Sequence, residues 1–238
     1  MDIKQAEKFL EVVEKMRKNN PKVEALYADV LNVYYPKVQT LPAEYLEVWD
    51  ASLIARLRHL SGVSVEASKV ERAVAYVPKY SGAPVPPILF GQLRIGRDFQ
   101  GSATSDQQAI VGFPSDKVVG RPLIVVAGMM NKNELGADEI PVQVFRHAVS
   151  KTWVAVNNRG YATHCMAGLK PLRIWPRLPD QMEINRLDEV EGKDHARFFT
   201  YASGVEHLAK KPHTLPSLQI PITDGPNSWN VTAVVTVP

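Results

Sequence analysis

The sequence contains a single cysteine, Cys165, in 238 residues. One thiol excludes a disulfide within the chain and any zinc site built from several thiolates. The residues after Met1 lack the basic and then apolar pattern of a secretory signal peptide. No apolar run approaches the roughly 20 residues that a membrane-spanning helix needs. We therefore expect a soluble protein with no membrane partner, in the cytoplasm or in a virion-like particle, and not secreted.

Sequence motifs of nucleotide, metal and hydrolase sites are also missing. Gly91 and Gly96 have the spacing of a Walker loop, but Arg97 and Asp98 follow where Lys and Ser or Thr would hold phosphate and Mg²⁺. The six histidines form no His-Glu-x-x-His motif, and no Gly-x-Ser-x-Gly sequence occurs. These absences predict no metal, no cofactor and no catalytic residue, and hence a protein that is not an enzyme.

Cys165 is the candidate nucleophile for an alternative in which the protein is an enzyme. A histidine within hydrogen-bond reach would turn its thiol into a thiolate, but His164 precedes it on a predicted strand, where adjacent side chains point to opposite faces. Since Met166 and Ala167 follow it, we predict a small buried residue without reactivity.

The first 60 residues carry strong helical signals. Asp2 and Gln5 have the spacing of a capping box. Apolar residues then recur at helical spacing in three stretches, from Ile3 to Met16, from Val23 to Tyr34 and from Leu46 to Leu60. Nine basic residues balance nine acidic ones here, so this part is neutral. We predict about three helices over residues 1–60, forming a module for packing or assembly.

Residues 61–238 instead show short β-branched runs between Pro, Gly and Asn. Predicted strands cover residues 70–77, 88–95, 108–113, 122–126, 142–149, 152–156, 161–166, 169–175, 182–187, 218–222 and 229–237. A hairpin turn is predicted over residues 157–160, and residues 192–210 fit either a helix or a strand. The predicted fold class is α+β, with the N-terminal helical unit followed by a β-rich sandwich-like or barrel-like body.

Electrostatics provides the clearest candidate site. No acidic residue occurs between Glu139 and Asp180, although six cations and two tryptophans do. The candidate nucleic-acid-binding residues are Arg146, Lys151, Arg159, Lys170, Arg173, Trp175 and Arg177. Basic side chains neutralise phosphates, and an aromatic ring can stack on an unpaired base. The competing interpretation is a basic sheet face whose tryptophans belong to the core.

These patterns favour a non-enzymatic, self-assembling structural subunit, coat-like or particle-like, with a basic surface facing nucleic acid. Its partners would be further copies of itself and nucleic acid. The alternative is a stand-alone RNA- or DNA-binding protein in a ribonucleoprotein-type complex. A second alternative is a cysteine-dependent hydrolase centred on Cys165.

Overall fold

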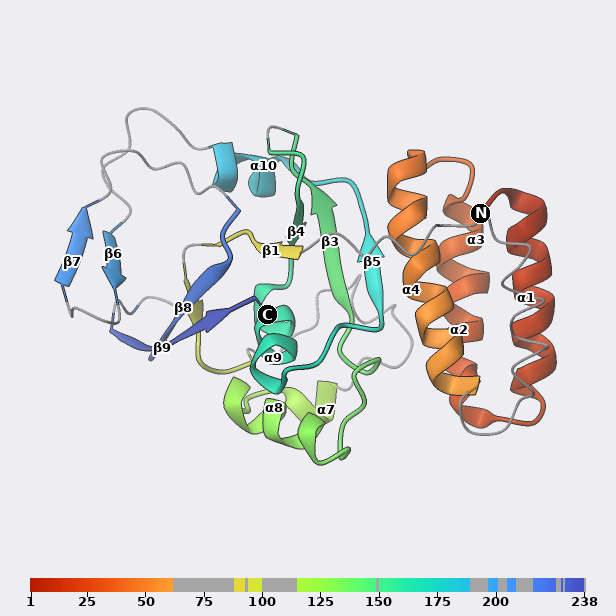
Figure 1. The fold of residues 1–238 in the computed structure, drawn as a ribbon, viewed down its shortest axis with the longest axis horizontal. Coiled ribbons are helices and arrows are strands. Elements are labelled where there is room, and N and C mark those ends of the chain that lie inside the picture. The colour runs from red at the N-terminus through yellow and green to blue at the C-terminus, as the bar shows by residue number, and fades with distance from the viewer. Residues whose placement is uncertain are drawn as a thin grey trace. The chain divides into compact units, whose positions relative to one another are not determined.

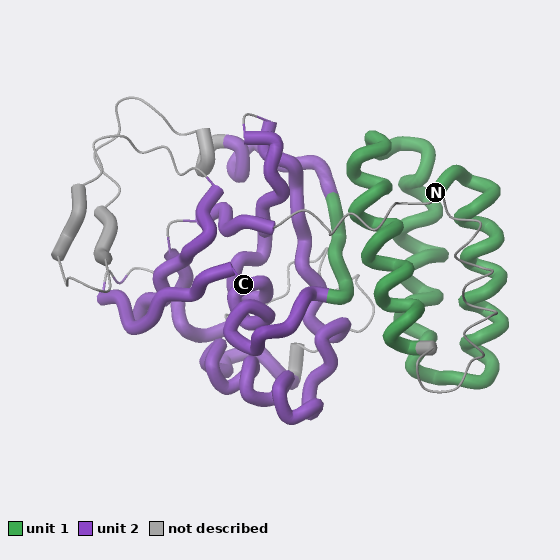
Figure 2. Tube along the Cα trace, in the orientation of Figure 1, with its two compact units in different colours: residues 1–85, 103–113, 172–176 green, residues 86–102, 114–171, 177–238 purple. Residues whose placement is uncertain are grey.

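The computed structural model describes residues 1–61, 88–92, 94–99, 115–148, 150–188, 197–200, 205–208, 216–225, 228 and 230–237. Two compact units divide the chain (Figure 2). Unit 1 takes residues 1–85, 103–113 and 172–176, and unit 2 takes residues 86–102, 114–171 and 177–238. Figure 1 shows a mixed α and β protein with helices at its N-terminus, as the sequence predicts.

The described residues of unit 1 form helices and one short strand. They are α1 (Ile3–Arg17), the 3₁₀ turn η1 (Pro21–Val23), α2 (Glu24–Asp29), the π turn η2 (Val30–Tyr34), α3 (Tyr35–Lys37), α4 (Ala43–Ser61) and β5 (Ile174–Pro176). The predicted capping box is confirmed, because the Asp2 and Gln5 side chains each accept the other's backbone N–H at 2.8 Å. The predicted second helix is broken into four pieces, and the last contains Pro36, which has no N–H to donate.

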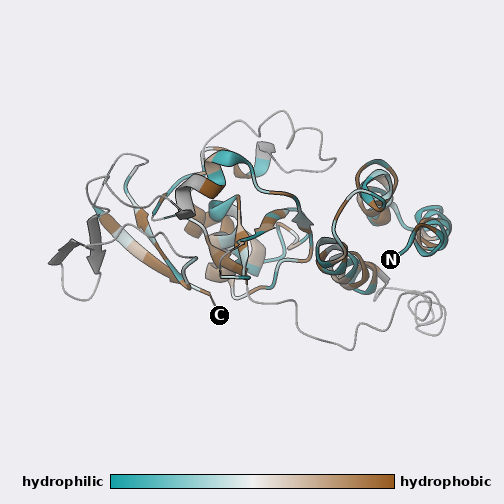
Figure 3. Cartoon of the chain, turned by 90° about the horizontal axis from the view of Figure 1, so that it is seen from above, coloured by the Kyte–Doolittle hydropathy of each residue, from teal (hydrophilic) through white to brown (hydrophobic). Residues whose placement is uncertain are grey.

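Apolar side chains at helical spacing form the core of unit 1. The most buried include Phe9, Val13, Leu26, Val30, Trp49, Leu53 and Leu57. Seen nearly end-on in Figure 3, these helices each carry hydrophobic and hydrophilic residues. This pattern is typical of amphipathic helices that share one apolar interior.

Unit 2 holds the remaining helices and strands. They are β1 (Ile88–Phe90), β2 (Ile95–Gly96), α7 (Ser115–Val118), α8 (Leu123–Asn131), β3 (Val142–Arg146), β4 (Trp153–Ala155), α9 (Asn158–Ala167), α10 (Gln181–Asp188), β6 (Arg197–Thr200), β7 (Val205–Leu208), β8 (Gln219–Thr223) and β9 (Val231–Thr236). In unit 2, β4 lies between β1 and β3, parallel to β1 and antiparallel to β3. A second sheet has the order β2-β8-β9, and β6 pairs with β7. The described strands close into no barrel, so the barrel-like body is not seen and the sandwich stays a prediction.

The strands predicted within residues 142–149, 152–156, 218–222 and 229–237 are confirmed by β3, β4, β8 and β9. For residues 192–210, the strand alternative is confirmed by β6 and β7. Predicted strands over residues 70–77 and 108–113 lie outside the described residues. Three others, over residues 122–126, 161–166 and 182–187, are wrong, because residues 123–126, 161–166 and 182–187 belong to helices α8, α9 and α10.

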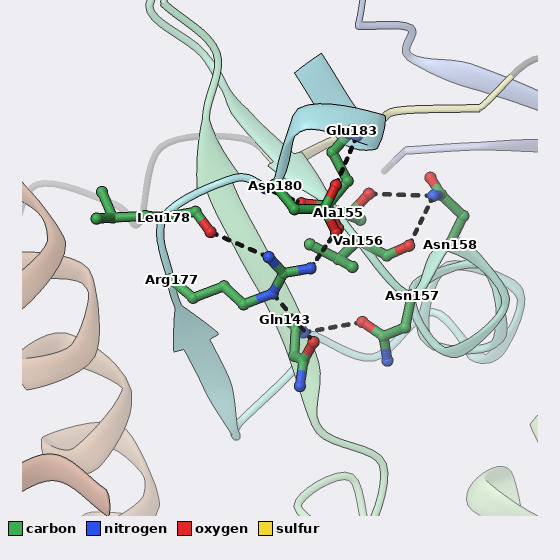
Figure 4. Close-up of polar contacts among 9 residues, drawn as sticks. All are labelled: Gln143, Ala155, Val156, Asn157, Asn158, Arg177, Leu178, Asp180 and Glu183. Carbon is green, nitrogen blue, oxygen red and sulfur yellow. Dashed lines mark hydrogen bonds and ion pairs between the residues drawn. The ribbon is translucent and has the colours of Figure 1, made fainter. Parts of the chain in front are cut away.

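The predicted hairpin turn at residues 157–160 is also wrong, and two asparagines explain why (Figure 4). Asn157 accepts the Gln143 N–H at 2.8 Å, and Asn158 donates to the Ala155 carbonyl at 3.0 Å. Asn158 also accepts the Gly91 N–H at 2.9 Å. Both side chains thus bond β-strand backbone at the point where α9 begins, so the chain turns into a helix instead of a second strand.

Helix α10 has a sequence signal that strand periodicity concealed. Asp180 accepts the Glu183 N–H at 2.8 Å, and Glu183 accepts the Asp180 N–H at 2.9 Å. This reciprocal pair is a capping box, which satisfies backbone donors at the start of a helix.

Candidate functional site

The seven predicted nucleic-acid-binding residues are divided between the two units. Arg173 and Trp175 belong to unit 1, whereas the other five belong to unit 2. Lys151 and Lys170 are exposed, and Arg146 is half-buried. Arg159 donates from Nε to the Gly96 carbonyl at 3.3 Å, and burial lowers its pKa.

Arg173 is a buried anchor and not a surface cation. Its guanidinium donates to one oxygen of Asp29, whose other oxygen accepts from Arg56. All three side chains are about 98% shielded from solvent, each being 2% exposed. A polyanion therefore has no access to Arg173, whose charge is already met by a carboxylate inside unit 1.

The residues around Arg173 hold the whole segment Leu172–Pro176 on the helices of unit 1. The Ser52 hydroxyl donates to the Leu172 carbonyl at 2.7 Å and accepts the Ile174 N–H at 2.8 Å. The Trp175 ring lies 6.0 Å from that of Trp49, centroid to centroid. Trp175 is half-buried and packs against an indole of unit 1.

A second buried carboxylate lies in the same unit. Asp50 accepts hydrogen bonds from the Tyr34 hydroxyl and from the Met1 ammonium. Burial raises the pKa of Asp50, and these hydrogen bonds partly oppose the rise. Among the described residues of unit 1, the buried carboxylates of Asp29 and Asp50 are thus both engaged by the protein's own donors.

Arg177 is neutralised within unit 2, as Figure 4 shows. It forms an ion pair with Glu183 and donates to the Leu178 carbonyl at 3.0 Å. Glu183 lies six residues along the chain, beyond the acid-free stretch, so a count of acids within that stretch could not reveal the pair. Its other oxygen caps α10 through Asp180, which makes Arg177 a support for this helix.

Cys165 lies on α9, where the predicted strand geometry does not apply. Burial raises the pKa of its thiol to about 11. His164 is fully buried, hydrogen-bonds through Nε2 to the Ile140 carbonyl at 2.9 Å, and has a pKa lowered to about 4 by burial. The site provides neither a thiolate nor an adjacent accessible base near neutral pH, so it gives the hydrolase alternative no support.

We expect Cys165 to react slowly with an aromatic disulfide reagent in the native protein at pH 7. A pKa of about 11 leaves roughly one thiol in ten thousand ionised. The chain unfolded in denaturant is the control and should react promptly. Prompt reaction of the native chain would restore the reactive-cysteine alternative.

The described part of the chain contains neither a cluster of metal ligands nor a membrane-spanning helix. No three His, Cys, Asp or Glu side chains gather there in a way that could hold a metal ion. None of its helices has the length and apolar character needed to cross a bilayer.

Helix α8 presents an apolar surface that the sequence analysis missed. Its inward side is made by Leu123, Val126, Ala127 and Met130, all buried. Its outward side is also apolar, with Ile124 64% and Val125 44% exposed. Gly128 follows Ile124 by one turn, and beyond its chain neighbours and the backbone of α8 no atom lies within 4 Å of where its Cβ would be. We call Ile124, Val125 and Gly128 the outer face of α8.

The predicted strand over residues 122–126 lies within a run that is apolar from Pro122 to Met130. A short, continuous apolar run has no period that separates a buried strand from a helix. Here the Pro122 carbonyl accepts the N–H groups of Val125 at 3.0 Å and Val126 at 3.2 Å, which starts the helix. Only the resulting 3.6-residue period reveals that half of the run faces outward.

Charged residues flank the outer face at both ends of the helix. Arg121 lies just before α8 and reaches the Met129 sulfur at 3.9 Å. Lys132 and Glu134 follow the last turn, and both are exposed. The outer face is therefore a small apolar surface with charged side chains beside it, a composition typical of contact surfaces.

Comparison with family models, with curated proteins and with solved structures found no match for this chain.

Proposed function

We propose that this protein is a non-enzymatic subunit that assembles by self-association, and that copies meet through the outer face of α8. A helix that is apolar on all sides is normally covered on all sides. Burying apolar surface contributes about 25 cal/mol per Å², so leaving Ile124 and Val125 in water forgoes stabilisation that a contact would recover. The exposed apolar outer face is the observation that supports the proposal.

The helical module of residues 1–60 remains a candidate for a second contact. Deleting it to test assembly would remove Asp29 and Arg56, and would leave Arg173 without the carboxylate that it contacts. If assembly were lost after such a deletion, the loss could not be distinguished from an effect of lower stability. Single substitutions on the outer face avoid this problem.

Nucleic-acid binding stays a hypothesis that rests on Lys151 and Lys170, the exposed cations among the predicted residues. Reversing the charge of Arg173 would place a second carboxylate beside buried Asp29, and reversal at Arg177 would break its pair with Glu183. Substitutions at the two lysines alter surface charge without disturbing these buried and half-buried pairs.

We expect Ile124→Glu to weaken self-association by roughly a hundredfold or more. A carboxylate desolvated in an apolar contact, with no partner, costs on the order of 3 kcal/mol. Position 124 lies in the first turn of α8, where a negative charge is favourable, so the monomer should fold normally. Sedimentation equilibrium of both proteins gives the two association constants.

Met182→Glu provides the matched control. Met182 is 63% exposed, as much as Ile124, and also lies in the first turn of a helix of unit 2. It should leave association unchanged. Equal weakening by both variants would mean that α8 is not the contact, and that added negative charge alone opposes association.

A further inference from the structure

We propose that the outer face of α8 packs antiparallel against α8 of a second copy, with each Ile124 seated over the other copy's Gly128. This inference rests on the proposed self-association and assigns its contact geometry. It follows from three properties of the helix: a projecting side chain, an open position one turn away, and a difference in charge between its ends.

The projection and the open position lie on the same side of α8. Residues four apart on a helix are neighbours on one face. Ile124 extends a branched side chain into solvent, and Gly128 offers a surface without a side chain and without nearby atoms. A single nine-residue helix thus carries both halves of a close contact.

A two-fold axis joins these halves only when the helices run antiparallel. In a two-fold contact the same patch serves both copies, so if residue i meets residue j, then j also meets i. The antiparallel arrangement pairs Ile124 with Gly128 twice. A parallel two-fold arrangement would pair Ile124 with itself and leave Gly128 facing Gly128, with a gap between them.

Charge favours the same arrangement. The N-terminal end of α8 carries the positive end of the helix dipole, and the C-terminal end carries the negative end. Lys132 and Glu134, just beyond the last turn, have opposite charges and leave that difference in place. Antiparallel packing places each positive end beside the negative end of the other copy, whereas parallel packing would place like ends together.

The substitution Gly128→Leu distinguishes this geometry from nonspecific association of an apolar surface. The position is open, so leucine fits the monomer, and it favours helix more than glycine does. We expect a monomer that unfolds at a temperature no lower than before and self-associates at least tenfold more weakly in sedimentation equilibrium. Stronger or unchanged association would overturn the proposed seating of Ile124 over Gly128.

Cysteine cross-linking tests directly whether the two α8 helices pack antiparallel. In a Cys165→Ala background, Ile124→Cys and Gly128→Cys are made as separate chains, and Met182→Cys serves as the control. Under mild oxidation, we expect a mixture of the first two chains to form disulfide-linked dimers several-fold faster than either chain alone. Met182→Cys should cross-link slowly in every sample.

Each outcome of the cross-linking decides between the claims. Fast dimer formation by Ile124→Cys alone would show parallel pairing and overturn the antiparallel geometry. Association without cross-links at either position would overturn the α8 pairing while self-assembly itself stands. If Cys165→Ala and the unsubstituted chain are both monomeric, the outer face is covered by something else, and the proposed function fails together with this inference.

Discussion

Replacing Asp29 with asparagine should lower the free energy of unfolding by about 3–5 kcal/mol. The carboxylate holds two guanidinium groups, those of Arg56 and Arg173, and all three side chains are buried. Asparagine has the same shape but no charge, so two buried cations would lose their counter-charge. Since most domains are stable by about 5–15 kcal/mol, this single change should approach complete unfolding.

Arg173→Leu is the matched comparison for that prediction. It removes one cation and leaves the pair between Asp29 and Arg56 intact, so we expect a smaller loss of stability than for Asp29→Asn. Urea unfolding followed by tryptophan fluorescence measures both variants, because Trp49 and Trp175 lie in the same unit. An equal or larger loss for Arg173→Leu would mean that packing of residues 172–176, and not charge, dominates.

Acidification should weaken the fold through His164. Burial lowers the pKa of this histidine to about 4, whereas an unfolded chain titrates near 6.5. Between these values the unfolded state binds the proton and the folded state does not, so stability falls as the pH falls. The difference is about 2.5 pKa units, which corresponds to about 3 kcal/mol present above pH 6.5 and lost by pH 4.

Hydrogen bonding identifies the proton that His164 keeps. A carbonyl only accepts, so Nε2 carries the hydrogen that bonds Ile140, and Nδ1 is buried without a hydrogen-bond partner. A glutamine at this position can donate to the same carbonyl but does not titrate. We expect His164→Gln to flatten the loss of stability between pH 6.5 and 4, as measured by urea unfolding at each pH. An unchanged pH profile in that variant would assign the titration to another group.

Local signals were sufficient for the helices of unit 1. The capping box at Asp2 and the helical period after it depend only on residues close in sequence, and α1 follows them. The same holds for β8 and β9, whose alternating residues pair as antiparallel strands. Local signals failed at α8, where a run without polar residues has no visible period.

The positions of the cations in the basic segment could not be predicted from the sequence, for a different reason. Arg173 and Asp29 are 144 residues apart, so their contact leaves no trace in a local count of charges. Arg177 reaches Glu183, just past the boundary where the count ended. Of the cations in this segment, Arg173 therefore lies in a buried ion cluster and Arg177 supports helix α10. Lys151 and Lys170 are exposed at the surface.

Sedimentation velocity of the unmodified chain, from micromolar to near-millimolar concentration, is the direct test of self-association. We expect a species heavier than the 26.5 kDa chain whose share grows with concentration, since copies join through the outer face of α8. A single species of 26.5 kDa over the whole range would contradict self-assembly and the role given to that face.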